Sequence, residues 1–170
     1  MKIRTLGLLL LSLAAPAAVT LAQGGPASSD LTDVTCIFAD GKGMRVQYDH
    51  SEKVTKRQPP EGKAWSPAGK PFLLFLDTSI SVGNTTLPVG AYRLFAIPAK
   101  SSWSLVVNKD VAATANRDES QDIARESMPT GQLEDGKQIA TIYLAHTAAN
   151  QCNIRIVYGK TMAWGEFYEK

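Results

Sequence analysis

Apolar residues recur at every second position along much of this chain, and this alternation limits its fold more than any other feature. Met44, Val46 and Tyr48 alternate with polar residues, and the segment 103–107 repeats the spacing with Trp, Leu and Val. A repeat of two belongs to a β-strand with one buried face, whereas a helix repeats about every 3.6 residues. The pattern therefore predicts an all-β fold.

Eight or nine mostly antiparallel strands are expected, separated by turns. They cover residues 34–39, 44–48, 72–76, 79–82, 87–97, 103–107, 138–145, 153–158 and 162–168. This spacing favours a Greek-key β-sandwich, with a partly open barrel as the alternative. Residues 50–70 contain three prolines and are expected to form one long loop. Residues 108–126 are polar, and we expect a short helical turn there or a crossing between sheets.

A tyrosine corner is predicted at residues 87–92. Leu87, Pro88, Gly90 and Tyr92 have the Leu-Pro-x-Gly-x-Tyr pattern, in which the tyrosine hydroxyl bonds the backbone a few residues upstream. Such corners lie where a chain passes between the two sheets of a Greek-key sandwich. The motif therefore favours the sandwich.

The first 22 residues have the three parts of a secretory signal peptide. Lys2 and Arg4 form a basic start, residues 6–19 are apolar, and residues 20–22 form a small-x-small cleavage site. An uncleaved membrane anchor is the alternative. It is disfavoured because the apolar run contains Pro16 and is shorter than the roughly 20 residues that span a membrane.

Cleavage after Ala22 changes the composition of the chain. It would leave residues 23–32 as a flexible lead-in and 33–170 as a single β-sandwich domain, with no transmembrane segment. Lys2 and Arg4 are two of 18 basic residues, so the exported part has 16 basic and 16 acidic residues. Nucleic-acid binding needs clustered positive charge, so no nucleic-acid partner is expected. We expect the protein in the periplasm or outside the cell.

The two cysteines, Cys36 and Cys152, are predicted to form a disulfide. Each falls on the apolar face of its strand, and an even number of cysteines in an exported chain favours pairing. Two separate buried thiols are the alternative.

Trp65 and His50 are the candidate ligand-binding residues. Trp65 is the large side chain of the Pro-rich loop, where it serves either as a surface for a ligand or, if buried, as a pin for the loop. Trp103 and Trp164 lie in alternating strands and are expected in the core. His50 and His146 lack metal-ligand spacing, so neither a metal nor a cofactor is expected.

No catalytic residue is assigned from the sequence. Asp110, Asp118, Glu119 and Asp122 form an acidic cluster without the spacing of an EF-hand, which favours a solvated face over a Ca²⁺ site. The chain has no GxSxG or HExxH motif.

Four segments together resemble a known family. Residues 87–98 read Leu-Pro-Val-Gly-Ala-Tyr-Arg-Leu-Phe-Ala-Ile-Pro, residues 103–109 read Trp-Ser-Leu-Val-Val-Asn-Lys, and segments 36–42 and 121–125 add to the likeness. They resemble the secreted bacterial family called domain of unknown function 2911. The resemblance implies an exported bacterial β-rich domain. It transfers no catalytic residue, because the family has no assigned activity.

The chain departs from that family after the Gly-Lys-x-Trp element at residues 62–65. Many members continue with Arg and a Thr-Gly-Ala-Asn-Glu type of segment, whereas this chain continues as Ser-Pro-Ala-Gly-Lys-Pro.

Three functions follow as hypotheses. The first is a non-catalytic binding or structural module of the cell envelope, with a glycan or an envelope protein as its partner. The alternative is a hydrolase of carbohydrate or peptide that uses carboxylates of the loops 50–70 and 108–126. A subunit of an envelope complex is the third, and it predicts a large exposed apolar patch.

Overall fold

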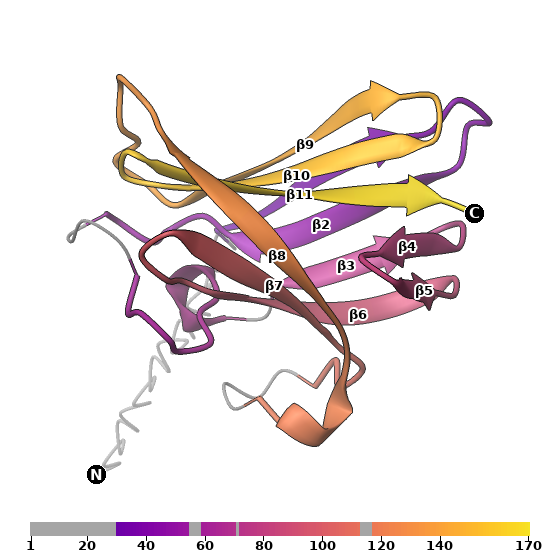
Figure 1. Ribbon diagram of the computed structural model, residues 1–170, viewed down its shortest axis with the longest axis horizontal. Helices are drawn as coiled ribbons and strands as arrows, with labels where there is room; N and C mark the ends of the chain where they lie inside the picture. Colours follow the sequence, from indigo (N-terminus) through magenta and orange to yellow (C-terminus); the bar gives the residue numbers. More distant parts are fainter. Residues whose placement is uncertain (1–29, 55–58, 71, 113–116) are drawn as a thin grey trace, which may run out of the picture.

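The computed structural model describes residues 30–170 except 55–58, 71 and 113–116 (Figure 1). The expected export signal and residues 23–29 of the expected lead-in lie outside the described residues. The first strand begins at Leu31, so the last two residues of that lead-in belong to a strand.

Eleven strands and two short 3₁₀ turns make up the described fold. The strands are β1 Leu31–Ile37, β2 Gly43–Asp49, β3 Leu73–Leu76, β4 Ile80–Val82, β5 Thr85–Leu87, β6 Gly90–Ile97, β7 Ser102–Asn108, β8 Asp122–Gln132, β9 Thr141–Ala148, β10 Gln151–Tyr158 and β11 Thr161–Glu169, and the turns are η1 Pro67–Gly69 and η2 Glu119–Gln121. Within the described residues, no helix is long and apolar enough to span a membrane.

Every strand pairing is antiparallel, which confirms the predicted all-β class. The strands follow the order β1-β2-β3-β6-β7-β8-β11-β10-β9, and the short β4–β5 hairpin is attached to β11. In Figure 1, β8 crosses diagonally from the side of β7 to that of β11. The last four strands of the path form a Greek key, because the chain passes from β8 to the far strand β9 and returns through β10 to β11.

The two ends of this strand path meet, so the sheet nearly closes on itself. β1 lies against β9, and the Cys36–Cys152 disulfide joins β1 to β10. The Ile142 backbone N–H of β9 donates to the Tyr48 hydroxyl of β2 over 3.1 Å. Glu52 lies just beyond β2, and its carbonyl accepts from the Ala140 backbone N–H over 2.9 Å. We call this set of contacts the seam.

The interior is filled by the inward face of each alternating strand. Its fully buried side chains include Trp103, Phe72, Phe167, Met44, Leu74, Leu94, Leu105, Met128 and Ile142. Burial of one such side chain is worth about 1.5–3 kcal/mol. The alternation read from the sequence is therefore the pattern of the core.

Strand β8 was not predicted, and its inward face explains why. Ala124, Glu126 and Met128 pair with core residues of β7, so this face carries a small and a charged residue instead of an apolar stripe. The segment 108–126 does contain the expected helical turn, η2, but its last five residues already belong to β8. This strand and the short β5 were not among the predicted strands, and they raise the number from nine to eleven.

The tyrosine corner has the expected hydrogen bond. The Tyr92 hydroxyl donates to the Pro88 carbonyl over 2.8 Å, and Leu87 is fully buried. The corner joins β5, which belongs to the hairpin on β11, to β6, which pairs with β3 and β7. The motif thus lies where the chain passes from one part of the sheet to another.

The disulfide is expected to contribute strongly to stability, because it closes a sequence separation of 116 residues. Replacing both Cys36 and Cys152 with Ala should lower the free energy of unfolding by about 2–5 kcal/mol, as measured by urea denaturation. A reducing agent should destabilise the wild-type protein similarly and leave the double variant unchanged. Equal stability of the oxidised wild type and the double variant would contradict a structural role for the disulfide.

Candidate functional site

A surface hollow lies between described residues of the loops 50–70 and 109–121, beside β6. We call it the loop cleft. Its volume is about 620 Å³, and its lining consists of Glu52, Ala64, Trp65, Ser66, Ala68, Gly69, Phe95 and Arg117. Three of these residues, Ser66, Ala68 and Gly69, belong to the segment where the chain departs from the family pattern.

Trp65 anchors the Pro-rich loop to the sheet. Its backbone exchanges hydrogen bonds of 2.7 and 2.9 Å with Ala96 of β6. Its indole packs edge-on against Trp103 at 6.1 Å and Tyr158 at 5.8 Å between ring centroids. With 9% of its surface exposed, Trp65 presents only a small part of its surface to the loop cleft. Of the two roles expected for Trp65, the structure shows the pin.

Glu52 fixes the same loop from a second point. One carboxylate oxygen accepts from the Trp65 indole N–H over 3.3 Å, and the other accepts from the Ala68 backbone N–H over 2.7 Å. The backbone carbonyl of Glu52 is part of the seam. The nearly closed sheet therefore positions the Glu52 carboxylate, which holds one wall of the loop cleft.

Asp49 and Lys70 tie the ends of the Pro-rich loop together. The Asp49 carboxylate is 1% exposed and lies 2.7 Å from the Lys70 ammonium. It also accepts from the backbone N–H and the hydroxyl of Ser51. Burial raises the pKa of Asp49, but these hydrogen bonds outweigh it and lower the pKa to about 2.

Two guanidinium groups flank Phe95, which projects from the outer face of β6. The Arg93 guanidinium lies 4.7 Å and that of Arg117 5.9 Å from the ring centroid. Arg93 is 1% exposed and donates to the Ala112 carbonyl over 3.2 Å. Burial lowers the pKa of Arg93, and the nearby Asp110 opposes that shift.

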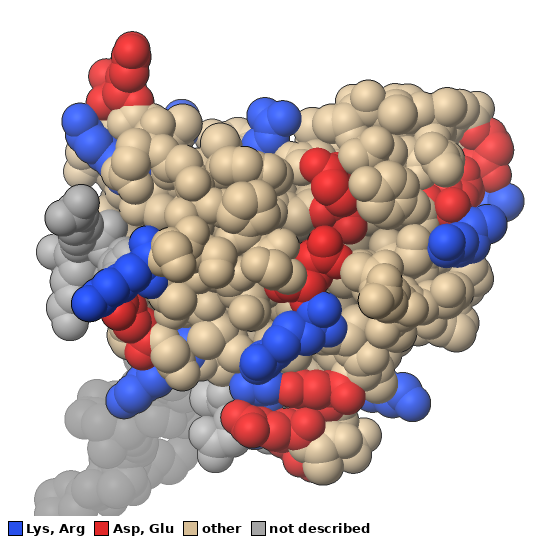
Figure 2. Space-filling model, viewed as in Figure 1, with Lys and Arg blue, Asp and Glu red and all other residues tan. Residues whose placement is uncertain are grey.

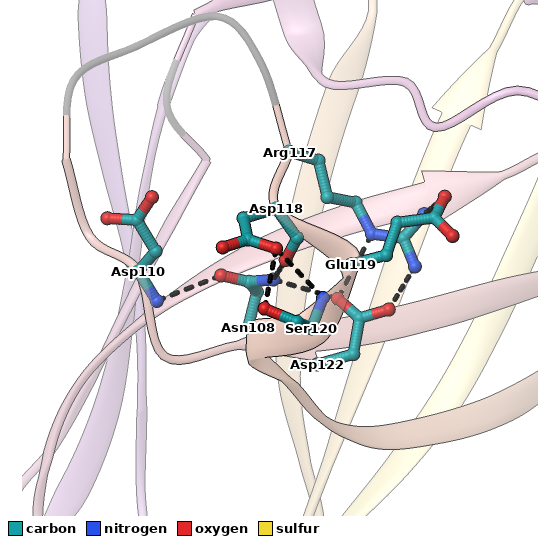
Figure 3. Close-up of polar contacts among 7 residues, drawn as sticks. All are labelled: Asn108, Asp110, Arg117, Asp118, Glu119, Ser120 and Asp122. Atoms are coloured by element: carbon teal, nitrogen blue, oxygen red, sulfur yellow. Dashed lines mark hydrogen bonds and ion pairs between the residues drawn. The ribbon is translucent and has the colours of Figure 1, made fainter.

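Asn108 organises the loop that carries Arg117 (Figure 3). Its amide N–H groups donate to the Asp118 carbonyl and to the Asp122 carboxylate, each over 2.8 Å. Its amide oxygen accepts from the Asp110 backbone N–H over 2.8 Å. One buried side chain thereby joins both ends of the 109–121 loop.

Arg117 is held by the acidic residues around it. Its Nε donates to Asp122 over 3.0 Å, a second nitrogen pairs with the other Asp122 oxygen, and Nη1 lies 3.1 Å from Glu119. Burial raises the pKa of Asp122, but the hydrogen bonds from Arg117 and Asn108 outweigh it and leave the pKa lowered. The acidic cluster expected to be a solvated face thus contains two carboxylates, those of Asp122 and Glu119, that contact Arg117.

The structure does not bring the two candidate ligand-binding residues together. His50 is exposed at the end of β2 and does not line the loop cleft, whereas Trp65 does. His146 is exposed on β9. Among the described residues, no group of three or more His, Cys, Asp or Glu is placed to hold a metal ion.

The three tryptophans are distributed differently from the expectation. Trp103 is fully buried, as predicted. The prediction for Trp164 is wrong, because its side chain is only partly buried and lies on the outer face of β11, where it lines a second hollow. Its strand alternates regularly, but the inward positions are Ala163, Gly165 and Phe167.

Glu52, Phe95 and Arg117 line the cleft and were missed as site residues. A weak signal exists for Phe95, since Tyr92 to Ile97 is almost continuously apolar and such a run is typical of a strand covered on both faces. Nothing in the sequence pairs Glu52 with Trp65 or Arg117 with Asp122, because these contacts depend on how two long loops fold back.

On the face seen in Figure 2, basic and acidic side chains are interspersed, without a large area of either sign. This distribution agrees with the balanced charge of residues 23–170 and gives that face no basic patch of the kind that binds nucleic acid.

The sequence comparison assigns a family. The model of a family described as protein of unknown function (DUF2911) matches residues 37–166. The chain belongs to the DUF2911 family. The matched region includes every residue that lines the loop cleft. No curated protein and no solved structure matches the chain, so the function of this DUF2911 protein is inferred from its own residues.

The anchoring role of Trp65 predicts a large loss of stability on truncation. Trp65→Ala should lower the free energy of unfolding by about 3–5 kcal/mol, and Trp65→Phe by less, in urea denaturation. Trp164→Ala is the matched control and should cost less, because Trp164 is partly exposed. A smaller loss for Trp65→Ala than for Trp164→Ala would contradict the anchor.

The Asp49 carboxylate predicts a specific acid response. Its pKa falls from 3.8 to about 2 on folding, so its stabilisation is present above about pH 4 and is lost as the pH falls towards 2. Unfolding free energies measured in urea between pH 2 and 6 should therefore fall more steeply at acid pH for the wild type than for Asp49→Asn. Parallel curves would contradict the assignment.

Proposed function

We propose that this DUF2911 protein is an exported, non-catalytic binding module of the bacterial cell envelope, with the loop cleft as its ligand site. The arrangement of charge in the cleft carries the proposal. Glu52 and Arg117 are its charged lining residues, and each is held by hydrogen bonds within the protein. Fixed polar groups around an aromatic side chain suit a preformed binding surface.

Catalysis by the loop carboxylates is less well supported. A general acid or base must exchange a proton with the substrate. Glu52 instead holds Trp65, and Asp122 accepts from Asn108 and Arg117. Asp118 accepts from the backbone N–H and the hydroxyl of Ser120. These bonds favour structural roles, so we keep the hydrolase as the alternative.

Export is supported by two independent features. The disulfide is typical of proteins in oxidising compartments outside the cytoplasm. Residues 1–22 have the pattern of a secretory signal peptide.

A binding screen that includes a variant with a filled loop cleft tests this function. The exported protein is titrated by calorimetry against glycans, peptides and metal ions. Ala64 is exposed and lines the cleft, so Ala64→Trp should fill the cleft and abolish binding of its ligand. Ala99→Trp is the matched control, because Ala99 is exposed but lies in the turn after β6.

Two results would contradict the proposal. Absence of binding to every class would favour a structural protein of the envelope. Turnover of a glycan or peptide that is blocked by Ala64→Trp would favour the hydrolase.

A further inference from the structure

A second hollow lies on the outer face of β9, β10 and β11. We call it the sheet-face site. Its volume is about 310 Å³, and its lining consists of Thr147, Asn153, Arg155, Met162, Trp164 and Glu166. None of these residues lines the loop cleft. The two hollows therefore share no lining residue.

An aromatic and cationic row crosses this face. Tyr143, Arg155 and Trp164 are directly opposite one another in the registers of β9, β10 and β11. Side chains in register on neighbouring strands have Cβ atoms about 4.5–5.5 Å apart. Tyr143 is 39% exposed, and Tyr168, further along β11 on the same face, is 41% exposed. This sheet face thus has aromatic side chains on both sides of Arg155, and one of them, Trp164, lines the hollow.

The Trp164 indole lies beside a glycine of the neighbouring strand. A Cβ atom built on Gly131 of β8 would lie 3.4 Å from Cζ3 and 3.8 Å from Cη2 of Trp164. A Cβ at Gly131 would thus be in van der Waals contact with the ring, and a longer side chain there would reach over it. Since Trp164 is only partly buried, the rest of the ring faces the hollow.

A fixed set of polar side chains lies beside the ring. The two oxygens of the Glu166 carboxylate accept from the Gln151 and Asn153 amides, each over 2.7 Å. The Asn153 amide oxygen accepts from Arg155 Nε over 2.8 Å, and Asn153 is 3% exposed. These bonds fix the Glu166 carboxylate and the Arg155 guanidinium before any ligand arrives. The terminal amino groups of the exposed Arg155 have no partner among the described residues.

These features fit one class of ligand. A pyranose ring has apolar C–H groups on its faces and hydroxyls at its rim, so it stacks on an indole and bonds planar polar side chains at the same time. Arg155 and Glu166 contribute one charge of each sign, so the lining has no excess charge to attract an ionic ligand. Three aromatic residues spread over one sheet face suit several sugar units better than one.

We propose that the sheet-face site binds a neutral oligosaccharide, with one sugar stacked on Trp164 and its hydroxyls bonded to Arg155 and Glu166. The site would act as a platform that holds a glycan chain across β9–β11. It does not depend on a ligand in the loop cleft.

Calorimetry with chitohexaose and cellohexaose tests the proposal on the exported protein. At least one hexasaccharide should bind. Trp164→Ala should weaken binding by at least about tenfold, the effect expected from loss of one stacked aromatic ring. Trp164→Phe should restore most of the affinity, because it keeps an aromatic face. Arg155→Ala should also weaken binding, whereas Lys109→Ala, on an exposed loop residue outside both hollows, should not.

Two further variants keep the test decisive. Gly131→Leu retains Trp164 but places a side chain against its ring, and should weaken binding even if Trp164→Ala proves unstable. Ala64→Trp fills only the loop cleft and should leave hexasaccharide binding unchanged. Failure of both hexasaccharides to bind would overturn the proposal. The proposal would also be overturned if Ala64→Trp lost hexasaccharide binding and Trp164→Ala retained it. That result would place the glycan in the loop cleft.

Discussion

The rest of this structure depends on the near closure of the sheet, where the two ends of the strand path, β1 and β9, meet. The Cys36–Cys152 disulfide and the bond from Ile142 to the Tyr48 hydroxyl join strands that lie about a hundred residues apart in the sequence. The seam continues into the first loop, because the Glu52 backbone accepts from Ala140. With its backbone fixed there, the Glu52 side chain reaches Trp65 and holds the loop wall. The loop cleft is thus a consequence of how the sheet closes.

Charged and polar side chains are buried around the outer face of β6. Phe95 is 3% exposed on that face and lines the loop cleft with described residues of the two loops, 50–70 and 109–121. Two guanidinium groups and the Asn108 amide supply the contacts that hold the second loop in place. A buried polar group is costly unless it is hydrogen-bonded. The dense bonding around Asn108 therefore both stabilises the loop and fixes the orientation of Arg117.

The sequence predicted the features that depend on local pattern. Alternation identified the β class and placed Cys36 and Cys152 on inward faces, and the Leu-Pro-x-Gly-x-Tyr motif located the corner at Tyr92. It failed for β8, because Ala124 and Glu126 occupy inward positions next to core residues of β7. It also failed for Trp164, since a period of two shows that one face is buried but not which one. The smaller residues of β11 turned out to face inward, and Trp164 faces outward with polar neighbours of β10.

The contrast between Trp65 and Trp164 is central to both proposed sites. It can be measured by fluorine NMR of protein labelled with 5-fluorotryptophan, with each resonance assigned by single Trp→Phe variants. A soluble paramagnetic agent should broaden the Trp164 resonance strongly and leave those of Trp65 and Trp103 sharp. Broadening of Trp65 with protection of Trp164 would contradict the assignment of Trp65 as the loop anchor and of Trp164 as the exposed platform.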